Sequence, residues 1–323
     1  MPQLRFNPLR GEWVAYAPER NDRIFLPTDN CPLCPSGPRG HSEVPHDDFE
    51  VAVFENRFPA LGPARDLDGH PPRPLGAGCE VVVYTSVHDA TLANLPVERV
   101  RLLLEVWVDR YRVLSARPDV RYVYIFENKG VEMGVTLRHP HGQIYALPFT
   151  PPAVALELSS AARYRRRTAR CLHCERVRVE SQGPRRLFSD DAVLAYVPEA
   201  ARWPYEVHLY LTRHVATLGE LHDHERWALS VALLRVTQAF DRRFGFPTAY
   251  VMAVHQSPCA PPRRDDAHVH IEFYPPYRRH DRLKYLAGTE LGAGTWINDT
   301  YPEDTAAELR RADAAARAAG GSC

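Results

Sequence analysis

Two long segments of the chain have the apolar spacing of amphipathic helices, and each lies among short apolar runs. In residues 97–116 the apolar side chains recur every three or four positions, which predicts a helix with one buried face. A second such helix is expected at 223–244, a linking helix at 152–170 and an Ala-rich helix at 302–319. The runs that predict strands are 51–54, 81–85, 122–126, 143–147, 193–197, 207–211, 249–254 and 269–273.

The chain carries the same series of motifs twice. The first copy contains Cys31-Pro-Leu-Cys34, then His88, then His139-Pro-His141. The second contains Cys171-Leu-His-Cys174, then His214, then His268-Val-His270. His139 follows His88 by 51 residues and His268 follows His214 by 54, so the order and the spacing both indicate a duplication.

The repeat and the predicted elements together define a fold class. We expect an α+β protein built by tandem duplication of one unit, in which an antiparallel sheet carries a packed helix. The 323 residues are enough for two domains. We place these at 1–165 and at 166–323, the second a degenerate copy of the first.

The charge balance argues against large anionic partners. Forty basic residues against forty acidic ones give no net charge, so neither nucleic acid nor a membrane surface is an expected partner. The N-terminus shows no secretory leader and the chain has no apolar span for a bilayer, so we expect a cytoplasmic protein. In that reducing compartment, seven cysteines are better explained as thiols or metal ligands than as disulfides.

The paired cysteines and the repeated histidines have the composition of zinc sites. Two cysteines separated by two residues can bind one ion from a single turn, and two histidines at strand ends could complete a tetrahedron. The long intervals to the histidines exclude a nucleic-acid finger, so two structural zinc sites are expected. The alternative is two pairs of buried thiols. The predicted ligands are Cys31, Cys34, His88 and His139 at the first site and Cys171, Cys174, His214 and His268 at the second.

His141 is the side chain best suited to chemistry. It lies two positions after His139, so both project from the same side of an extended chain. Neutral imidazole is a good nucleophile towards phosphorus. Gly142 would allow a substrate to approach closely, and Gln143 would supply a neutral amide. The alternative is that His141 is one more metal ligand or a buried core histidine.

Several motifs resemble the galactose-1-phosphate uridylyltransferase branch of the histidine-triad superfamily. His139-Pro-His-Gly-Gln143, Phe126-Glu-Asn-Lys-Gly130 and Met133-Gly134 carry the likeness at the centre of the chain. It extends over nearly the whole sequence through Asn7-Pro-Leu-Arg-Gly-Glu-Trp13, Pro18-Glu-Arg-Asn-Asp-Arg23, Phe54-Glu-Asn56, Phe58-Pro-Ala-Leu61 and Phe273-Tyr-Pro-Pro276.

The resemblance implies a reaction and a set of residues for it. His141 would become uridylylated in a ping-pong exchange of UMP between UDP-glucose and galactose 1-phosphate, with Gln143 beside it. The resemblance also implies a homodimer. The residues that fall at nucleotide and phosphate positions are Arg20, Arg23, Asn56, Asn128, Gly134 and Thr136, and those at hexose phosphate positions are Lys284, Tyr285, Thr289 and Glu290.

Some positions depart from the family pattern. Arg57 stands where an acidic residue commonly follows the asparagine of the nucleoside loop, and the segment after Glu290 lacks a glutamine expected for a sugar contact. Some members hold a second metal on one glutamate and three histidines. The nearest matches here are Glu157, His255 and His270, with Glu272 replacing the last histidine; we prefer the set that begins at Cys171 because it repeats the first site.

Three other functions remain open from the sequence. An ADP-glucose phosphorylase would use the same histidine, a nucleotide hydrolase is disfavoured by Gln143, and a zinc-stabilised binding protein is disfavoured by the His139–Gln143 motif. In the second copy Ile271-Glu272 replaces Gly-Gln after His270, so this copy should be chemically silent. Cys79, Cys259 and Cys323 have no assigned role.

Overall fold

A computed structural model of the chain describes residues 3–27, 30–36, 42–44, 46, 48–61, 78–259 and 265–320. Cys323 lies outside these residues. The strands of the first copy are β3 (Ala52–Glu55), β4 (Cys79–Val83), β5 (Tyr122–Lys129) and β6 (His141–Leu147). Those of the second are β7 (Arg186–Ser189), β8 (Val193–Tyr196), β9 (Val207–Leu211), β10 (Tyr250–His255) and β11 (His270–Tyr274).

These strands form one nine-stranded antiparallel sheet in the described part of the chain, in the order β3-β4-β6-β5-β10-β11-β9-β8-β7. The order β3-β4-β6-β5 of the first copy is repeated as β8-β9-β11-β10 in the second, and the two copies meet where β5 pairs with β10. Phe126 faces Gln143 across one copy as Ala253 faces Glu272 across the other. The expected α+β fold and its tandem duplication are confirmed.

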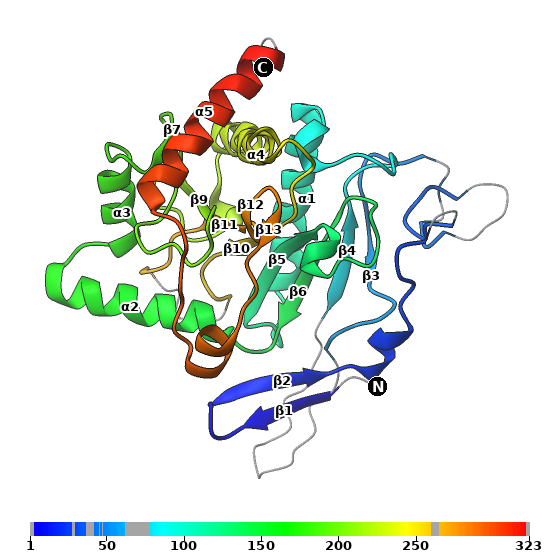
Figure 1. The fold of residues 1–323 in the computed structure, drawn as a ribbon. Helices are drawn as coiled ribbons and strands as arrows, with labels where there is room; N and C mark the ends of the chain where they lie inside the picture. The colour runs from blue at the N-terminus through cyan, green and yellow to red at the C-terminus, as the bar shows by residue number, and fades with distance from the viewer. Residues whose placement is uncertain are drawn as a thin grey trace.

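The helices cover the sheet unequally. The long helices are α1 (Val97–Ser115), α2 (Pro152–Thr168), α4 (Asp223–Phe244) and α5 (Pro302–Gly320), and the shorter α3 (Leu172–Glu180) lies near the start of the second copy. Helices α1, α4 and α5 lie along one side, whereas α2 and the hairpin of β1 (Gln3–Asn7) and β2 (Glu12–Tyr16) lie along the other (Figure 1). One continuous apolar core joins α1 and α4 to the sheet and contains Trp107, Ile125, Ile144, Phe240 and Ile271.

The predicted helices and strands are found close to their expected positions. The 223–244 helix and the 207–211 strand have the expected bounds, whereas β5 runs to Lys129 because it pairs with β10 beyond its partnership with β6. The elements that the apolar pattern missed include the β1–β2 hairpin, α3, β7 and the small pair β12 (Tyr277–Arg279) and β13 (Arg282–Leu283).

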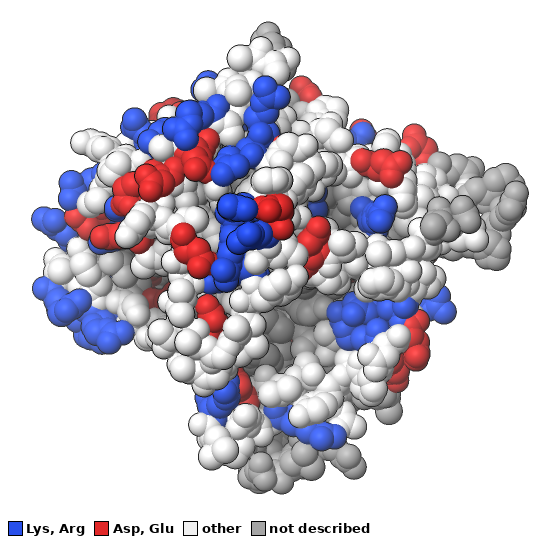
Figure 2. Space-filling view, viewed as in Figure 1, with Lys and Arg blue, Asp and Glu red and all other residues white. Residues whose placement is uncertain are grey.

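The visible surface mixes charges of both signs. On the face drawn in Figure 2, Lys and Arg side chains alternate with Asp and Glu, in agreement with the zero net charge. None of the helices in the described residues combines the length and the apolar character that crossing a bilayer requires.

Candidate active site

Strand alternation sets the orientation of the His141 segment. Ile144 of β6 points into the core beneath α1 and α4, so His141 and Gln143 project from the opposite face of the sheet. Val81 and Val83 of β4 pair with Gln143 and His141 and pack with Leu33 on that same face. The site is therefore built on a rigid central strand.

His141 has one ring nitrogen fixed and one free. Its Nδ1 lies 2.7 Å from the carbonyl oxygen of His139. A carbonyl oxygen can only accept, so Nδ1 carries the proton and Nε2 keeps its lone pair. Burial lowers the pKa of His141, with the His139 carbonyl opposing the shift. The imidazole is thus held neutral, in the tautomer that makes Nε2 a nucleophile.

Gly142 has a different role from the one its sequence suggested. A Cβ at this position would point to the helix side of the sheet, directly against the phenol oxygen of Tyr84 and 3.0 Å from the carbonyl oxygen of Phe126. Glycine is therefore required by packing behind the strand. Close approach of a substrate, which would occur on the other face, does not depend on it.

Gln143 is oriented by two donors. Its Oε1 accepts hydrogen bonds from Nδ2 of Asn56 at 3.2 Å and from the hydroxyl of Tyr145 at 3.1 Å. With Oε1 occupied in this way, the amide nitrogen is left to donate to a ligand. The Asn56 side chain is itself held in position, because its Oδ1 accepts a hydrogen bond from the backbone nitrogen of Phe58 at 2.9 Å.

The two arginines predicted to contact phosphate lie next to this network. Nη1 of Arg20 donates to the carbonyl oxygen of Phe58 at 3.1 Å and lies 3.5 Å from the Tyr145 hydroxyl. Nε of Arg23 donates to the carbonyl oxygen of Arg20 at 3.0 Å. Burial and the neighbouring Arg20 lower the pKa of Arg23, which remains a cation at neutral pH.

Two cavities meet at His141. The first, about 210 Å³, opens beside His141 and Gln143. It is the smaller cavity, but more of the predicted substrate residues line it than line the second. The second, about 390 Å³, contains Asn128 together with His88 and His139. Gly134 lines neither cavity; it closes the tight turn before Thr136 with a positive φ of 74°. The predicted residues that line the first cavity are Arg23, Asn56, Thr136, His141 and Gln143.

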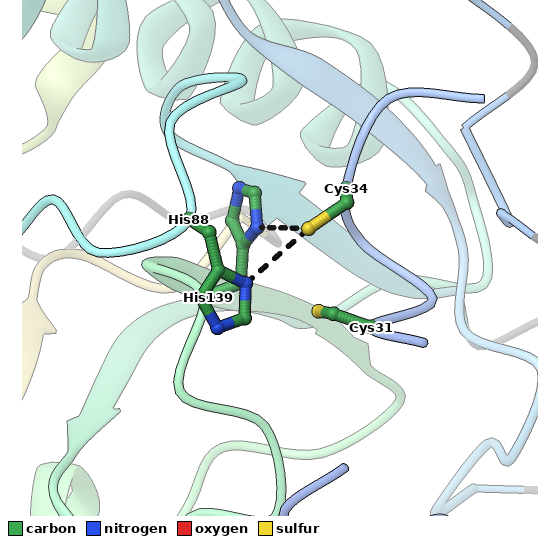
Figure 3. A group of neighbouring side chains, drawn as sticks. All are labelled: Cys31, Cys34, His88 and His139. Atoms are coloured by element: carbon green, nitrogen blue, oxygen red, sulfur yellow. Dashed lines mark hydrogen bonds between the residues drawn. The ribbon is translucent and has the colours of Figure 1, made fainter. Parts of the chain in front are cut away.

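The first predicted metal group is assembled. Cys31, Cys34, His88 and His139 converge from three separate segments (Figure 3), and their ligand atoms lie within 4.8 Å of one another. The Sγ of Cys34 lies 3.2 Å from Nδ1 of His88 and 3.5 Å from Nδ1 of His139. Nε2 of His139 is bonded to the carbonyl oxygen of Thr85 at 2.7 Å, which aims Nδ1 at the cluster. Two sulfur and two nitrogen donors suit a closed tetrahedral zinc site.

The second group repeats the first. Cys171, Cys174, His214 and His268 also have ligand atoms within 4.8 Å of one another. The Sγ of Cys174 lies 3.3 Å from Nδ1 of His214 and 3.7 Å from Nδ1 of His268. Nε2 of His268 lies 3.0 Å from the carbonyl oxygen of Leu211, and the equivalent contact of His139 Nε2 with the carbonyl oxygen of Thr85 is 2.7 Å. The donor chemistry again fits zinc.

A third group contains the residues that the sequence offered as a rival metal set. The ligand atoms of Glu157, His255, His270 and Glu272 lie within 4.8 Å of one another. Both carboxylate oxygens of Glu157 lie 3.0 Å from Nδ1 of His255, and Glu272 lies 3.3 Å from Nε2 of His270. Although burial opposes it, Glu272 and Glu157 raise the pKa of His255 to about 9. The two sets share no residue, so they do not compete for ligands.

The residues predicted to bind hexose phosphate form a separate group. Nζ of Lys284 lies 3.4 Å from Glu290, whose other carboxylate oxygen accepts from Thr289 at 2.9 Å. Lys284 is buried, whereas Tyr285 is 72% exposed. Within the described residues, none of the four lines either cavity that contains His141.

The structure adds residues that sequence reasoning missed. Tyr145 orients Gln143, and strand alternation could have identified it, since it follows Gln143 by two positions. Tyr84 and Glu127 lie behind the strand, and Glu43 lines the smaller cavity. Glu127 lies within the Phe126–Gly130 motif, which assigned it no role, and no local motif distinguishes Tyr84 or Glu43.

Comparison with known proteins agrees with the site. The family models for the N-terminal and C-terminal domains of galactose-1-phosphate uridyl transferase match residues 1–151 and 157–319. The galactose-1-phosphate uridylyltransferase of Thermotoga maritima is 37% identical over 97% of this chain and 99% of its own length. That of Streptomyces lividans is 41% identical over 86% of this chain and 78% of its own length.

Solved structures give the same result. One described as a uridylyltransferase is 36% identical, with a TM-score of 0.88 over 98% of this chain and 99% of that one. An ADP-glucose phosphorylase from Arabidopsis thaliana, at 23% identity and a TM-score of 0.74 over 96% of this chain and 98% of that one, shares the fold. The chain belongs to the galactose-1-phosphate uridylyltransferase family.

Proposed function

We propose that the chain exchanges UMP between UDP-glucose and galactose 1-phosphate through a uridylyl-histidine at His141. The observation that carries the proposal is the 2.7 Å contact between Nδ1 of His141 and the His139 carbonyl, which leaves Nε2 as the free nucleophile. Membership of the family supplies the substrates and the reaction class.

The proposed reaction has two balanced steps. In the first, Nε2 of His141 forms a bond to the α-phosphorus of UDP-glucose while the bond to the β-phosphate oxygen breaks, and glucose 1-phosphate leaves with the electron pair. In the second, a phosphate oxygen of galactose 1-phosphate attacks the same phosphorus and the phosphorus–nitrogen bond breaks. The leaving group is a stable anion, so a neutral amide at Gln143 suffices where an acid would otherwise be needed.

The surrounding residues would bind and neutralise the nucleotide. Arg20 lies 3.5 Å from the Tyr145 hydroxyl and Arg23 lines the cavity beside Gln143, so both would contact phosphate oxygens. Asn56, Asn128, Gly134 and Thr136 complete the proposed nucleotide side. The catalytic unit would be 1–165, and 166–323 the degenerate copy.

Two structural zinc ions belong to the proposal. Cys31, Cys34, His88 and His139 would hold one, and Cys171, Cys174, His214 and His268 the other. Each ion would fix turns and strand ends and take no part in the chemical steps. Thiolate ligands of this kind are in keeping with a reducing, cytoplasmic location.

A homodimer would complete the hexose side. Lys284, Tyr285, Thr289 and Glu290 lie outside both cavities at His141, in a segment whose side chains include the exposed Tyr285 and Leu291. Ile24 and Phe25, which are 49% and 69% exposed, add apolar surface beside the nucleotide side. Pairing of two chains through these surfaces would bury them and bring a hexose group to each nucleophile.

Incubation with UDP-glucose alone tests the chemistry. We expect one equivalent of glucose 1-phosphate per chain and an acid-labile uridylyl adduct at His141, both absent in His141→Asn. An adduct from ADP-glucose but none from UDP-glucose would identify an ADP-glucose phosphorylase instead. Continuous release of glucose 1-phosphate and UMP without an acceptor would identify a hydrolase.

A further inference from the structure

The smaller cavity at His141 has charged residues of both signs among its lining residues. Apolar side chains of Ile24, Leu33 and Phe58 form much of this lining, and His141 and Gln143 belong to it as well. The charged residues that also line it are Asp22, Arg23, Glu43 and Arg57. A nucleotide whose α-phosphate reaches His141 would place its nucleoside along these apolar walls.

Glu43 is held in place by the turn of the first cysteine pair. Its backbone nitrogen donates to the carbonyl oxygen of Pro32 at 2.8 Å, and the Ser42 hydroxyl donates to the same oxygen at 3.1 Å. The backbone nitrogen of Val44 donates to the Ser42 hydroxyl at 2.9 Å, and the Val44 side chain is buried. Residues 42–44 are therefore tied to the Cys31–Cys34 turn, and Glu43 has a fixed place in the wall.

Among the described residues, none donates a hydrogen bond to the Glu43 carboxylate, which is half-buried. Arg57, which follows Asn56 and has its guanidinium 5.6 Å from the Phe58 ring centre, supplies a neighbouring positive charge. Burial raises the pKa of Glu43, and Arg57 opposes this shift, so the cation favours the ionised form.

We propose that Glu43 is a specificity-determining residue whose carboxylate accepts a hydrogen bond from the nucleoside of the nucleotide sugar. This inference rests on the proposed function. Carboxylates only accept, and a uridine offers donors of two kinds, the ribose hydroxyls and N3–H of the base. Glu43 would thus provide, from the turn of the first cysteine pair, the acidic group that Arg57 replaces after Asn56.

The test compares Glu43→Gln with the parent chain. Glutamine can still accept a hydrogen bond, but a charged acceptor makes a stronger one than a neutral amide. The change should therefore weaken UDP binding and raise KM for UDP-glucose by up to about tenfold, with kcat changed less than about twofold. Glu50→Gln is the matched control, because Glu50 is exposed, pairs with Arg99 at 3.1 Å and does not line the cavity. Equal thermal midpoints for the two variants would show that Glu43→Gln folds normally.

A second variant and modified substrates sharpen the result. Arg57→Asp in the Glu43→Gln background places an acid beside Asn56 and should recover part of the UDP affinity. If the affinity does not recover, Glu43 does not take the place of an acid at position 57. For 2′-deoxy-, 3′-deoxy- and N3-methyl-UDP-glucose, the analogue on which Glu43→Gln has no effect identifies the donor. Unchanged UDP affinity in Glu43→Gln would overturn the inference. If the parent chain transfers no uridylyl group but Glu43→Gln still weakens UDP binding, the proposed function would be overturned and the contact of Glu43 with the nucleoside would stand.

Discussion

The phenol of Tyr84 lies directly behind Gly142, on the side of β6 opposite to the His141 imidazole. The backbone nitrogen of Tyr84 also donates to the carbonyl oxygen of Pro140 at 3.0 Å. Tyr84 thus contacts the residue before and the residue after His141. The position of His141 depends on packing from the helix side of the sheet as well as on the groups that line the cavities.

Gly142→Ala should therefore damage both stability and rate. The new methyl group would meet the Tyr84 hydroxyl and, at 3.0 Å, the Phe126 carbonyl oxygen. Overpacking of this kind costs about 1 to 3 kcal/mol of unfolding free energy. The displaced strand should lower kcat by at least about tenfold, since small shifts of a nucleophile have large effects. Denaturant unfolding and steady-state kinetics measure the two effects.

Tyr84→Phe provides the partner for a double-mutant cycle. Without the hydroxyl, the nearest atom to the added methyl is removed, so Gly142→Ala should be less harmful in the Tyr84→Phe background than alone. Additive effects of the two substitutions would show that the Tyr84 hydroxyl is not the obstacle.

Glu127 should make stability depend on pH. It is buried, and its Oε2 lies 3.5 Å and 3.3 Å from the hydroxyls of Tyr84 and Tyr250. Burial raises the pKa of Glu127 to about 7, against the opposing charge of Lys129. The unfolded carboxyl has a pKa of about 4.3, so between these values the folded chain binds more protons and loses stability as pH rises.

Glu127→Gln removes this titration and keeps the shape of the side chain. As the pH rises from 5 to 8, the free energy of unfolding of the variant should increase by about 2 kcal/mol relative to that of the parent chain. Denaturant unfolding at both pH values measures the difference, with Glu98→Gln, an exposed substitution on α1, as control. An equal stability difference at the two pH values would place the titration of Glu127 outside this range.

Sequence patterns predicted the features that depend on order along the chain. The duplication and the two cysteine–histidine groups follow from motif order and spacing, and α1 and α4 follow from apolar periodicity. The cysteine–histidine groups could be predicted because cysteine and histidine are rare in the chain and the arrangement occurs twice.

Features that depend on pairing between distant strands were not accessible in this way. Nothing around Tyr84 indicates that its hydroxyl lies behind Gly142, because that contact arises only when β4 pairs with β6. Similarly, Glu43 lines the cavity because a hydrogen bond from its backbone nitrogen to the carbonyl oxygen of Pro32 holds its segment there. The coexistence of the Cys171 and Glu157 groups also depends on register, since it places His268 in one group and His270 in the other.

Loss of the first metal group should weaken nucleotide binding. Pro32 and Leu33, which lie between its two cysteines, line the cavity beside His141. Cys34→Ser should therefore lower the thermal midpoint and raise the Kd for UDP. Cys174→Ser, the matching change in the second group, should spare UDP affinity, because no residue of that group lines the cavity within the described chain. Equal effects of the two variants on Kd would contradict a local role for the first turn.

The zinc content of variants should show which of the three candidate groups, two of cysteine and histidine and one of glutamate and histidine, bind metal. We expect two zinc ions per chain, one in each cysteine–histidine group. Cys171→Ser should reduce the count to one, because a tetrahedral site that loses a thiolate binds zinc far more weakly. Cys259→Ser should leave it at two, since Cys259 belongs to none of these groups. Glu157→Gln should also leave two, because Glu157 and His255 already neutralise each other as an ion pair. Elemental analysis of the purified chains measures the count, and a value that falls with Glu157→Gln and not with Cys171→Ser would move the second ion to the Glu157 group.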